Sequence, residues 1–161
     1  MNTVFLQLGS NMDDRNAHLK NANKLIAEEI GAIQKKSKIY ESVHWGVENQ
    51  NNYLNQVLEI KSEFSAEEVL GKVLQIEDKI GRIRSEKWGE RIIDIDILFF
   101  NDLIVEKEGM CIPHIHLHNR KFVLIPLNEI APSFTHPKYN KTIDELLKEC
   151  KDTEKVETYA V

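Results

Sequence analysis

The clearest pattern in the chain lies in the segment Gly81-Arg82-Ile83-Arg84-Ser85-Glu86-Lys87-Trp88-Gly89-Glu90-Arg91-Ile92-Ile93-Asp94-Ile95-Asp96-Ile97-Leu98-Phe99-Phe100. Its first half is a loop rich in basic residues, and its second half is an isoleucine-rich apolar run that only Asp94 and Asp96 interrupt. Such a run predicts a β-strand over Ile92–Phe100 that is buried on at least one face. Residues two apart on a strand point the same way and lie roughly 7 Å apart. We therefore expect the carboxylates of Asp94 and Asp96 to project from one face of this strand.

Two neighbouring carboxylates in an apolar strand are costly unless a cation neutralises them. A divalent metal is one such cation, and Mg2+ takes oxygen ligands and completes its shell with water and substrate phosphates. Arginines beside the pair would cover the charge of phosphate oxygens, as phosphoryl-type transfer requires. The alternative interpretation is that Asp94 and Asp96 face solvent and form ion pairs with Arg82 or Arg91.

The composition is that of one soluble globular domain spanning residues 1–161. Hydrophobic residues make up 42% of the chain and charged residues 29%, and both values are ordinary for this class. The net charge of −5 argues against a surface that binds nucleic acid, so the basic stretch from Arg82 to Arg91 predicts a site for a small anion. The chain has only Cys111 and Cys150, without the spacing of zinc ligands, and no apolar run long enough for a membrane span. We therefore expect a cytoplasmic protein with neither a membrane nor a nucleic-acid partner.

The chain up to Phe100 predicts an alternation of strands and helices. Strands are expected over Thr3–Leu8, Ile33–Tyr40, Tyr53–Lys61 and Ile92–Phe100. One helix should begin after a cap at Asp13 or Asp14 and end at Gly31 in the left-handed conformation, and another should begin with the capping box of Ser65 and Glu68 and end at Gly81. The order βαββαβ is typical of a ferredoxin-like core. We therefore expect an α+β fold with a mainly antiparallel sheet and helices packed on it.

The chain after Phe100 predicts less regular structure. Asn101-Asp102 predicts a hairpin turn into a strand at residues 103–105. The run Phe122–Leu127 predicts a short strand interrupted by Pro126, and Thr142–Lys148 predicts a helix. The charged tail after Cys150 is expected to fray.

A pocket for a flat ring is predicted around Asn55. Tyr53 and Asn55 follow a long polar loop, and loops of this length inside a compact domain are usually functional. The Asn55 side chain offers one acceptor and two donors, which suits a heterocycle with both kinds of edge group. Tyr53 and Phe122 could stack on such a ring from its two sides. The alternative is that both aromatic residues belong to the core and that Asn55 merely satisfies the end of a strand.

Alternating histidines follow Pro113, in the run His114-Ile115-His116-Leu117-His118. Pro113 and the absence of acidic neighbours favour a loop over a metal-binding strand. We therefore expect His114 to contact phosphate, rather than a site in which three histidines hold a metal. Trp88, in the basic loop, either anchors a closing lid or packs on the sheet.

The same residues carry a resemblance to a known family. The matching motifs, in chain order, are Gly9-Ser10-Asn11, Tyr53-Leu54-Asn55, Glu77, Gly81-Arg82-Ile83-Arg84, Glu86-Lys87-Trp88-Gly89, Arg91-Ile92-Ile93-Asp94-Ile95-Asp96, Pro113-His114 and Asn119-Arg120-Lys121-Phe122. Over nearly its whole length the chain resembles the 6-hydroxymethyl-7,8-dihydropterin pyrophosphokinases of folate biosynthesis. These enzymes transfer pyrophosphate from MgATP to the hydroxymethyl group of a reduced pterin and leave AMP. The resemblance implies the same activity here, with ATP and two Mg2+ ions. We expect a monomer whose partners are small molecules.

The resemblance also implies roles for individual residues. Asp94 and Asp96 would ligate the two Mg2+ ions, and the catalytic guanidinium groups of Arg82 and Arg91 would stabilise charge on the transferred group. The residues implied to lie at the nucleotide are Glu77, Arg82, Arg84, Trp88, Arg91, His114 and Arg120. The residues implied to form the pterin pocket are Ser42, Trp45, Tyr53, Asn55 and Phe122.

Two other classes of function stay open at this point. A palm-type cyclase or nucleotidyltransferase would also place paired carboxylates on strands, but it would not need Asn55 between two aromatic residues. A non-catalytic ferredoxin-like module that binds a small ligand or RNA would not need the Asp94 and Asp96 pair. Detection of AMP as the product separates a pyrophosphokinase from a cyclase, because a cyclase releases pyrophosphate.

Overall fold

The computed structural model describes residues 1–42, 52–81 and 92–160. Its strands are β1 (Asn2–Ser10), β2 (Ala32–Lys36), β3 (Tyr40–Ser42), β4 (Tyr53–Ser62), β5 (Asp94–Phe100), β6 (Val105–Lys107), β7 (Met110–Ile112) and β8 (Val156–Thr158). Its helices are α1 (Arg15–Glu29), α2 (Ala66–Ile80), the short 3-10 helix η1 (Leu117–Asn119), α3 (Lys121–Ile130) and α4 (Ile143–Glu149). None of these helices is both long enough and apolar enough to span a bilayer.

The main sheet of the described residues has six strands in the order β5-β1-β4-β3-β8, with β2 also paired to β4. Every neighbouring pair in it is antiparallel. The helix α1 connects β1 to β2 and the helix α2 connects β4 to β5, so each helical connection passes over one strand of the sheet. This is the ferredoxin-like arrangement. The prediction of an α+β fold with a mainly antiparallel sheet is therefore confirmed.

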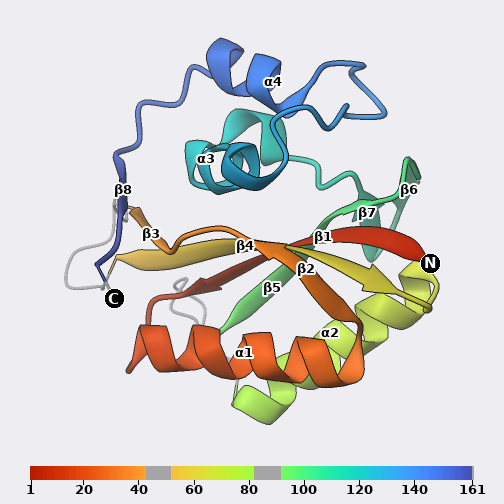
Figure 1. The fold of residues 1–161 in the computed structure, drawn as a ribbon, viewed down its shortest axis with the longest axis vertical. Coiled ribbons are helices and arrows are strands. Elements are labelled where there is room, and N and C mark those ends of the chain that lie inside the picture. Colours follow the sequence, from red (N-terminus) through yellow and green to blue (C-terminus); the bar gives the residue numbers. More distant parts are fainter. Residues whose placement is uncertain (43–51, 82–91, 161) are drawn as a thin grey trace.

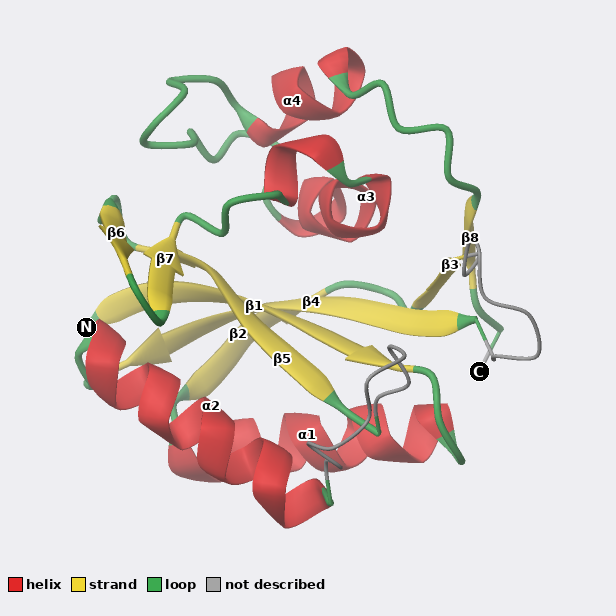
Figure 2. Ribbon diagram, turned by 180° about the vertical axis from the view of Figure 1, so that it is seen from behind, coloured by secondary structure: helices red, strands yellow, loops and turns green. Residues whose placement is uncertain are grey.

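Helices cover both faces of this sheet. The helices α1 and α2 lie against one face, and α3 and α4 lie over the other, which we call the α3 face (Figure 1, and from behind in Figure 2). The side chains of a strand alternate between faces, so each face carries its own core. On β1, Val4, Leu6 and Leu8 pack toward α1 and α2, whereas Phe5 packs toward α3 and α4. The strand β1 is therefore buried from both sides.

A β-bulge interrupts β5 at Leu98. Phe99 and Ile97 face consecutive residues of β1, so Leu98 between them is an extra residue. As a result Leu98 and Phe99 both pack on the α3 face, while Ile97 and Phe100 pack on the opposite face. The carbonyl oxygen of Leu98 accepts a hydrogen bond from the His114 backbone N–H at 3.0 Å. The bulge therefore ties the loop that carries His114 to β5.

The segment Phe122–Leu127 is helical, so the prediction of a strand there is wrong. It forms most of α3, which contains Pro126. Val123, Leu124 and Leu127 recur at helical spacing, and all of them pack in the core of the α3 face. A short apolar run fits a strand and a helix equally well, and the burial of this stripe against the sheet decides for the helix.

The turn after Phe100 exists, but it does not make the predicted hairpin. The strand β6 begins at Val105 and pairs with β7, not with β5. Asn101 instead ties the turn to β1, because its N–H donates to the Thr3 carbonyl at 2.8 Å and its Oδ1 accepts from the Thr3 N–H at 2.8 Å. The predicted strand Ile33–Tyr40 is likewise divided into β2 and β3. The break lies at Ser37, whose Oγ accepts a hydrogen bond from the β4 backbone at Val57, at 3.0 Å.

A glycine is required at position 31, after α1, for a steric reason. The predicted reason, a left-handed backbone conformation, is wrong. The left-handed glycines of the described residues are Gly81 and Gly109, and Gly81 caps α2 as predicted. A Cβ atom on Gly31 would lie 2.0 Å from the carbonyl oxygen of Lys61. The missing side chain therefore lets the end of α1 lie directly against the backbone of β4.

Gly31→Ala should lower the free energy of unfolding by at least about 2 kcal/mol, because the methyl group would force α1 away from β4. The matched control is Gly71→Ala in α2, where an added Cβ meets nothing within 4 Å. That change should raise the free energy of unfolding by about 0.5–1 kcal/mol, since alanine is the better helix former. Urea denaturation of both variants measures the difference, and equal stabilities would contradict the steric account.

Candidate active site

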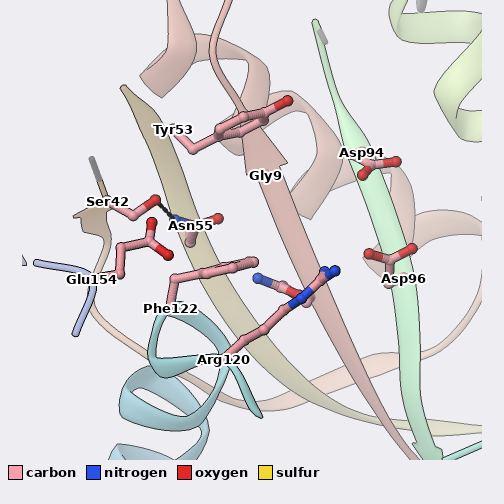
Figure 3. A pocket seen from close by; sticks show the side chains of 10 residues that line it. Gly9, Ser42, Tyr53, Asn55, Asp94, Asp96, Arg120, Phe122 and Glu154 are labelled. Carbon is pink, nitrogen blue, oxygen red and sulfur yellow. Dashed lines mark hydrogen bonds between the residues drawn. The ribbon is translucent and has the colours of Figure 1, made fainter. Parts of the chain in front are cut away.

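A cavity of about 400 Å³ lies on the α3 face of the sheet, between the strands and the start of α3. Figure 3 shows side chains from several strands, from α3 and from the C-terminal segment converging on it. The residues that line it are Gln7, Gly9, Ser42, Tyr53, Asn55, Asp94, Asp96, Arg120, Phe122 and Glu154. The structure therefore brings the predicted carboxylate pair and most of the predicted ring pocket together in one cavity.

One end of the cavity contains the aromatic and amide side chains of the predicted ring pocket. The side chains of Tyr53 from β4 and Phe122 from α3 lie on opposite sides of the Asn55 amide (Figure 3). Asn55 is only 2% exposed, and its Nδ2 donates a hydrogen bond to Ser42 Oγ at 3.0 Å, which fixes the amide plane. A ring stacked between the two aromatic side chains would present its edge to this amide.

Gly9 forms the floor beneath this end of the cavity. A Cβ atom there would lie 3.4 Å from Asn55 Oδ1 and 3.7 Å from Tyr53 Cδ1. The strand β1 therefore leaves room at this point for both ring-pocket side chains to lie close to its backbone.

The other end of the cavity carries the carboxylate pair. On β5, Asp94 lies opposite Gly9 and Asp96 lies opposite Gln7 of β1, and both carboxylates line the cavity from the α3 face (Figure 3). Carboxylate oxygens are the donors that Mg2+ prefers, and this ion usually keeps water and phosphate oxygens for the rest of its shell. No group of three or more His, Cys, Asp or Glu that could hold a metal forms in residues 1–42, 52–81 and 92–160. A two-carboxylate site that faces a cavity fits an ion bound together with a phosphorylated ligand.

Glu77 supports this pair from the opposite face of the sheet. It lies on α2, is 2% exposed, and its Oε2 accepts a hydrogen bond from the Ile95 backbone N–H at 2.8 Å. Within the described sheet β5 is an edge strand, so the N–H groups along its outer side need acceptors other than a neighbouring strand. Glu77 fills this role at the residue between Asp94 and Asp96, and it is not among the residues that line the cavity.

Near the carboxylates, Arg120 supplies a positively charged hydrogen-bond donor and His114 supplies a neutral one. Arg120 lines the cavity, with its Cζ 5.7 Å from the centre of the Phe122 ring. Burial lowers the pKa of His114 below its ordinary value, Arg120 and His116 lower it further, and Asp94 opposes them. The Nδ1 atom of His114 accepts a hydrogen bond from the His116 backbone N–H at 3.3 Å. The neutral imidazole therefore carries its proton on Nε2, where it can donate to an anion.

Glu154 also lines the cavity, although we expected the tail after Cys150 to fray. The structure instead holds residues 151–160, which we call the C-terminal segment, against the rest of the fold. Its strand β8 pairs with β3, and Asp152 Oδ2 accepts a hydrogen bond from the Lys121 N–H at 3.0 Å, at the start of α3. Burial, followed by the charge of Asp152, raises the pKa of the Glu154 carboxyl to about 7, while Arg120 acts in the opposite direction.

A weak signal for this arrangement is present in the sequence. Val156 and Tyr159 are apolar in an otherwise charged tail, and both are half-buried. The Tyr159 N–H donates to the Ile39 carbonyl at 2.8 Å, next to β3. Two such residues are too few to predict a strand from the sequence alone.

Five of the predicted site residues lie outside the described ranges. They are Trp45, Arg82, Arg84, Trp88 and Arg91. Their assignments stay predictions.

Comparison with known proteins identifies one family. The family model described as 7,8-dihydro-6-hydroxymethylpterin-pyrophosphokinase (HPPK) matches residues 5–132. The 2-amino-4-hydroxy-6-hydroxymethyldihydropteridine pyrophosphokinase of Aquifex aeolicus is 42% identical over 149 residues, which are 92% of this chain and 92% of that protein. The enzyme of the same name from Haemophilus influenzae is 37% identical over 94% of this chain and 95% of its own length.

A longer relative and a solved structure agree with this match. The folic acid synthesis protein FOL1 of Dictyostelium discoideum is 34% identical over 90% of this chain, which corresponds to 22% of that protein. The crystal structure of wild-type Plasmodium falciparum HPPK-DHPS superimposes with a TM-score of 0.76 and 20% identity, over 92% of this chain and 44% of that one. At this identity the structural likeness supports the fold alone.

The wild type should lose stability as the pH rises, because Glu154 ionises, and Glu154→Gln should remove this loss. The pKa of Glu154 is raised from 4.5 to about 7 in the folded chain, so the folded state keeps a proton that the unfolded state releases between these values. As the pH rises through this window, the free energy of unfolding of the wild type should fall relative to that of the variant. Solvent screening reduces the full effect, so we expect a difference on the order of 1–2 kcal/mol.

Urea denaturation below about pH 5 and above about pH 8 measures this difference. The control is Glu157→Gln, since Glu157 belongs to the same segment but is exposed. A stability difference between Glu154→Gln and the wild type that does not change with pH would show that Glu154 has no raised pKa.

Proposed function

Since this chain belongs to the 7,8-dihydro-6-hydroxymethylpterin-pyrophosphokinase family, we propose that the cavity on the α3 face is where it transfers pyrophosphate from ATP to the hydroxymethyl group of 6-hydroxymethyl-7,8-dihydropterin. The activity itself follows from the family and from relatives that carry this enzyme's name over nearly their whole length. The products are AMP and the pterin diphosphate, in a step of folate synthesis.

The observation that carries the proposed site is the presence of two different subsites in one cavity. Tyr53, Asn55 and Phe122 form one end, and Asp94 and Asp96 form the other. A pterin stacked at the first end would direct its hydroxymethyl group toward the carboxylates, where the triphosphate of ATP would lie. Neither a ring-binding module nor a general metal site requires this combination.

The chemistry is an in-line displacement at the β-phosphorus of ATP. The hydroxymethyl oxygen forms a new bond to this phosphorus and loses its proton, and the bond between the β-phosphorus and the oxygen that bridges to the α-phosphate breaks. AMP leaves with the bridging oxygen and its electron pair. The protein contributes mainly by positioning the two substrates and by stabilising charge on the phosphate oxygens.

Enzymes of this family generally use ATP with Mg2+, and we propose that Asp94 and Asp96 hold two such ions here. When bound, Mg2+ supplies positive charge that neutralises and aligns the phosphate oxygens. Glu77 keeps the backbone between the two carboxylates in place from behind the sheet. We therefore assign to Glu77 a positioning role at the nucleotide end, rather than direct contact.

The remaining phosphate contacts are assigned to basic residues. Arg120 in the cavity and the Nε2 proton of His114 beside it are suited to the phosphates of ATP. The family resemblance adds Arg82 and Arg91 as catalytic residues that stabilise the transferred group, and it adds Arg84 and Trp88 from a loop that closes over both substrates. It also adds Ser42 and Trp45 to the pterin pocket, and Ser42 already positions Asn55.

We propose that residues 1–161 act as one pyrophosphokinase domain and as a monomer, because the described residues of one chain already form both subsites of the cavity. A cytoplasmic location fits the use of ATP and the free thiols of Cys111 and Cys150. The substrates are small molecules, and the net charge of −5 gives no support to a nucleic-acid partner.

Incubation of the chain with ATP, Mg2+ and 6-hydroxymethyl-7,8-dihydropterin tests the function directly. Stoichiometric AMP and pterin diphosphate are expected. Release of free pyrophosphate would instead favour a cyclase or nucleotidyltransferase, and binding of an ATP analogue that ignored Mg2+ would favour a non-catalytic module.

Asp96→Ala should lower the rate of pyrophosphoryl transfer by at least about 10³-fold, because it removes a metal ligand. The fold should persist, since the change also relieves repulsion between two half-buried carboxylates. The control is Asp102→Ala in the exposed turn after β5, which should keep the wild-type rate. Thermal unfolding and AMP formation, measured on one preparation of each variant, give the answer. An active Asp96→Ala enzyme would defeat the assignment.

Tyr53→Ala should weaken pterin binding about 10–100-fold through the loss of ring stacking, and it should change the affinity for an ATP analogue by less than about twofold. Calorimetry with each ligand separately measures both affinities. The control is Tyr139→Ala, because Tyr139 is 41% exposed and does not line the cavity. Equal losses for both ligands would place Tyr53 outside the pterin subsite.

A further inference from the structure

The C-terminal segment forms one wall of the pterin end of the cavity. It crosses from α4 to β3, where Val156 pairs with Ser42, the residue that holds the Asn55 amide. Asp152 fixes the middle of this crossing, since its two carboxylate oxygens accept hydrogen bonds from the N–H groups of Lys121 and Glu154. The family model matches residues 5–132, and this wall follows that region in the chain.

Glu154 is the residue of this wall that reaches the cavity. Figure 3 shows its carboxyl group beside Ser42 and Asn55, on the side of the cavity that Phe122 closes. Within the described residues its carboxyl oxygens form no hydrogen bond or ion pair, and the bond to Asp152 uses the backbone N–H of Glu154 instead. A half-buried carboxyl group is costly without a partner, so its place in the wall is explained best by a ligand that supplies donors.

The pterin ring has such donors on one edge. Its pyrimidine half carries an amino group on C2 and an N–H at N3, which point in nearly the same direction. A carboxylate has two oxygens that accept two parallel hydrogen bonds from a pair of this kind, whereas the Asn55 amide has one oxygen and cannot accept both in that geometry. Asn55 Nδ2 is already engaged with Ser42 Oγ.

We propose that Glu154 is a specificity-determining residue for the pterin, whose carboxylate accepts hydrogen bonds from the 2-amino group and the ring N–H of a pterin held between Tyr53 and Phe122. This inference rests on the proposed function, because it requires a pterin at this end of the cavity. It adds to the pocket a contact from a segment that the family motifs do not include.

The charge around Glu154 gives this contact a pH dependence. Arg120 at the start of α3 favours its ionised form, whereas Asp152 on its own segment and burial disfavour it. Asp94 and Asp96 face it across the cavity. The donors of a bound pterin stabilise the carboxylate further, so pterin affinity should rise as the pH increases through about 7 in the wild type. The affinity of a Glu154→Gln variant should lack this rise.

The test measures pterin affinity by calorimetry, with the full chain, Mg2+ and a non-hydrolysable ATP analogue present. Above about pH 8, Glu154→Gln should bind 6-hydroxymethyl-7,8-dihydropterin about 10-fold more weakly than the wild type, which is the usual loss when a charged acceptor is removed. The control Glu157→Gln lies on β8 of the same segment and is exposed, so it should bind as the wild type does. The affinity of both variants for the ATP analogue should stay within about twofold of the wild type.

A pterin analogue with hydrogen in place of the 2-amino group provides the second measurement. The wild type should lose at least about 10-fold in affinity for it, because the Glu154 carboxylate would lose a donor. Glu154→Gln should lose clearly less. Equal losses in both proteins, or an affinity of Glu154→Gln for 6-hydroxymethyl-7,8-dihydropterin equal to that of the wild type, would overturn the proposal.

These outcomes are separate from a failure of the proposed function. If the wild type forms no AMP from ATP and 6-hydroxymethyl-7,8-dihydropterin, the proposed function fails. If the wild type is active and Glu154→Gln keeps the wild-type pterin affinity and its pH dependence, the role of Glu154 alone fails. Normal binding of the ATP analogue shows in every case that the variant is folded.

Discussion

The strand β1 hydrogen-bonds to a partner strand on each of its edges, and this double pairing fixes where the residues of the site lie. It joins β4 along its whole length on one side and β5 on the other. The register of these pairs brings Asn55 of β4 and Asp94 of β5 to the two sides of the same residue, Gly9. The ring pocket and the carboxylate pair are therefore adjacent, because the strands that carry them, β4 and β5, both pair with β1 in a fixed register. Neither could shift along the sheet without breaking a ladder of backbone hydrogen bonds.

The two faces of the sheet have different roles in the site. Side chains on the α3 face touch the cavity, while the face toward α1 and α2 is packed with apolar side chains and holds the strands in place. Glu77 is a buried polar residue on that second face, and it reaches the backbone of β5 at Ile95. The carboxylates thus stand on a strand that is fixed by packing and by a buried hydrogen bond, which suits groups that must be positioned before a substrate arrives.

Local patterns in the sequence predicted the parts of the fold that depend on local rules. The two-residue period put Asp94 and Asp96 on one face, and the capping box of Ser65 with Glu68 is present at the start of α2. The order of strands and helices was sufficient for the ferredoxin-like core. The family motifs named Tyr53, Asn55 and Phe122, and the structure brings them together although Phe122 lies on a helix and not on the expected strand.

The features that the sequence did not reveal depend on contacts between distant segments. Gly31 looked like a helix cap, but its reason is the backbone of Lys61, thirty positions away in the sequence. Glu154 looked like part of a solvated tail, and only the pairing of β8 with β3 and the cap at the start of α3 place it in the cavity.

Because of the extra residue at Leu98, the face on which the Asp94 and Asp96 carboxylates lie depends on the number of residues in β5. It does not depend on which side chain stands in the bulge. From Phe100 backwards, strict alternation would point Asp96 and Asp94 into the apolar layer under α2, and the bulge reverses this parity. A single insertion or deletion between Ile97 and Phe99 would therefore bury both carboxylates among apolar side chains, even with every functional residue retained. Insertions and deletions in β5 are therefore not tolerated in this enzyme. Point substitutions in the bulge leave the carboxylates of Asp94 and Asp96 on the same face of the sheet.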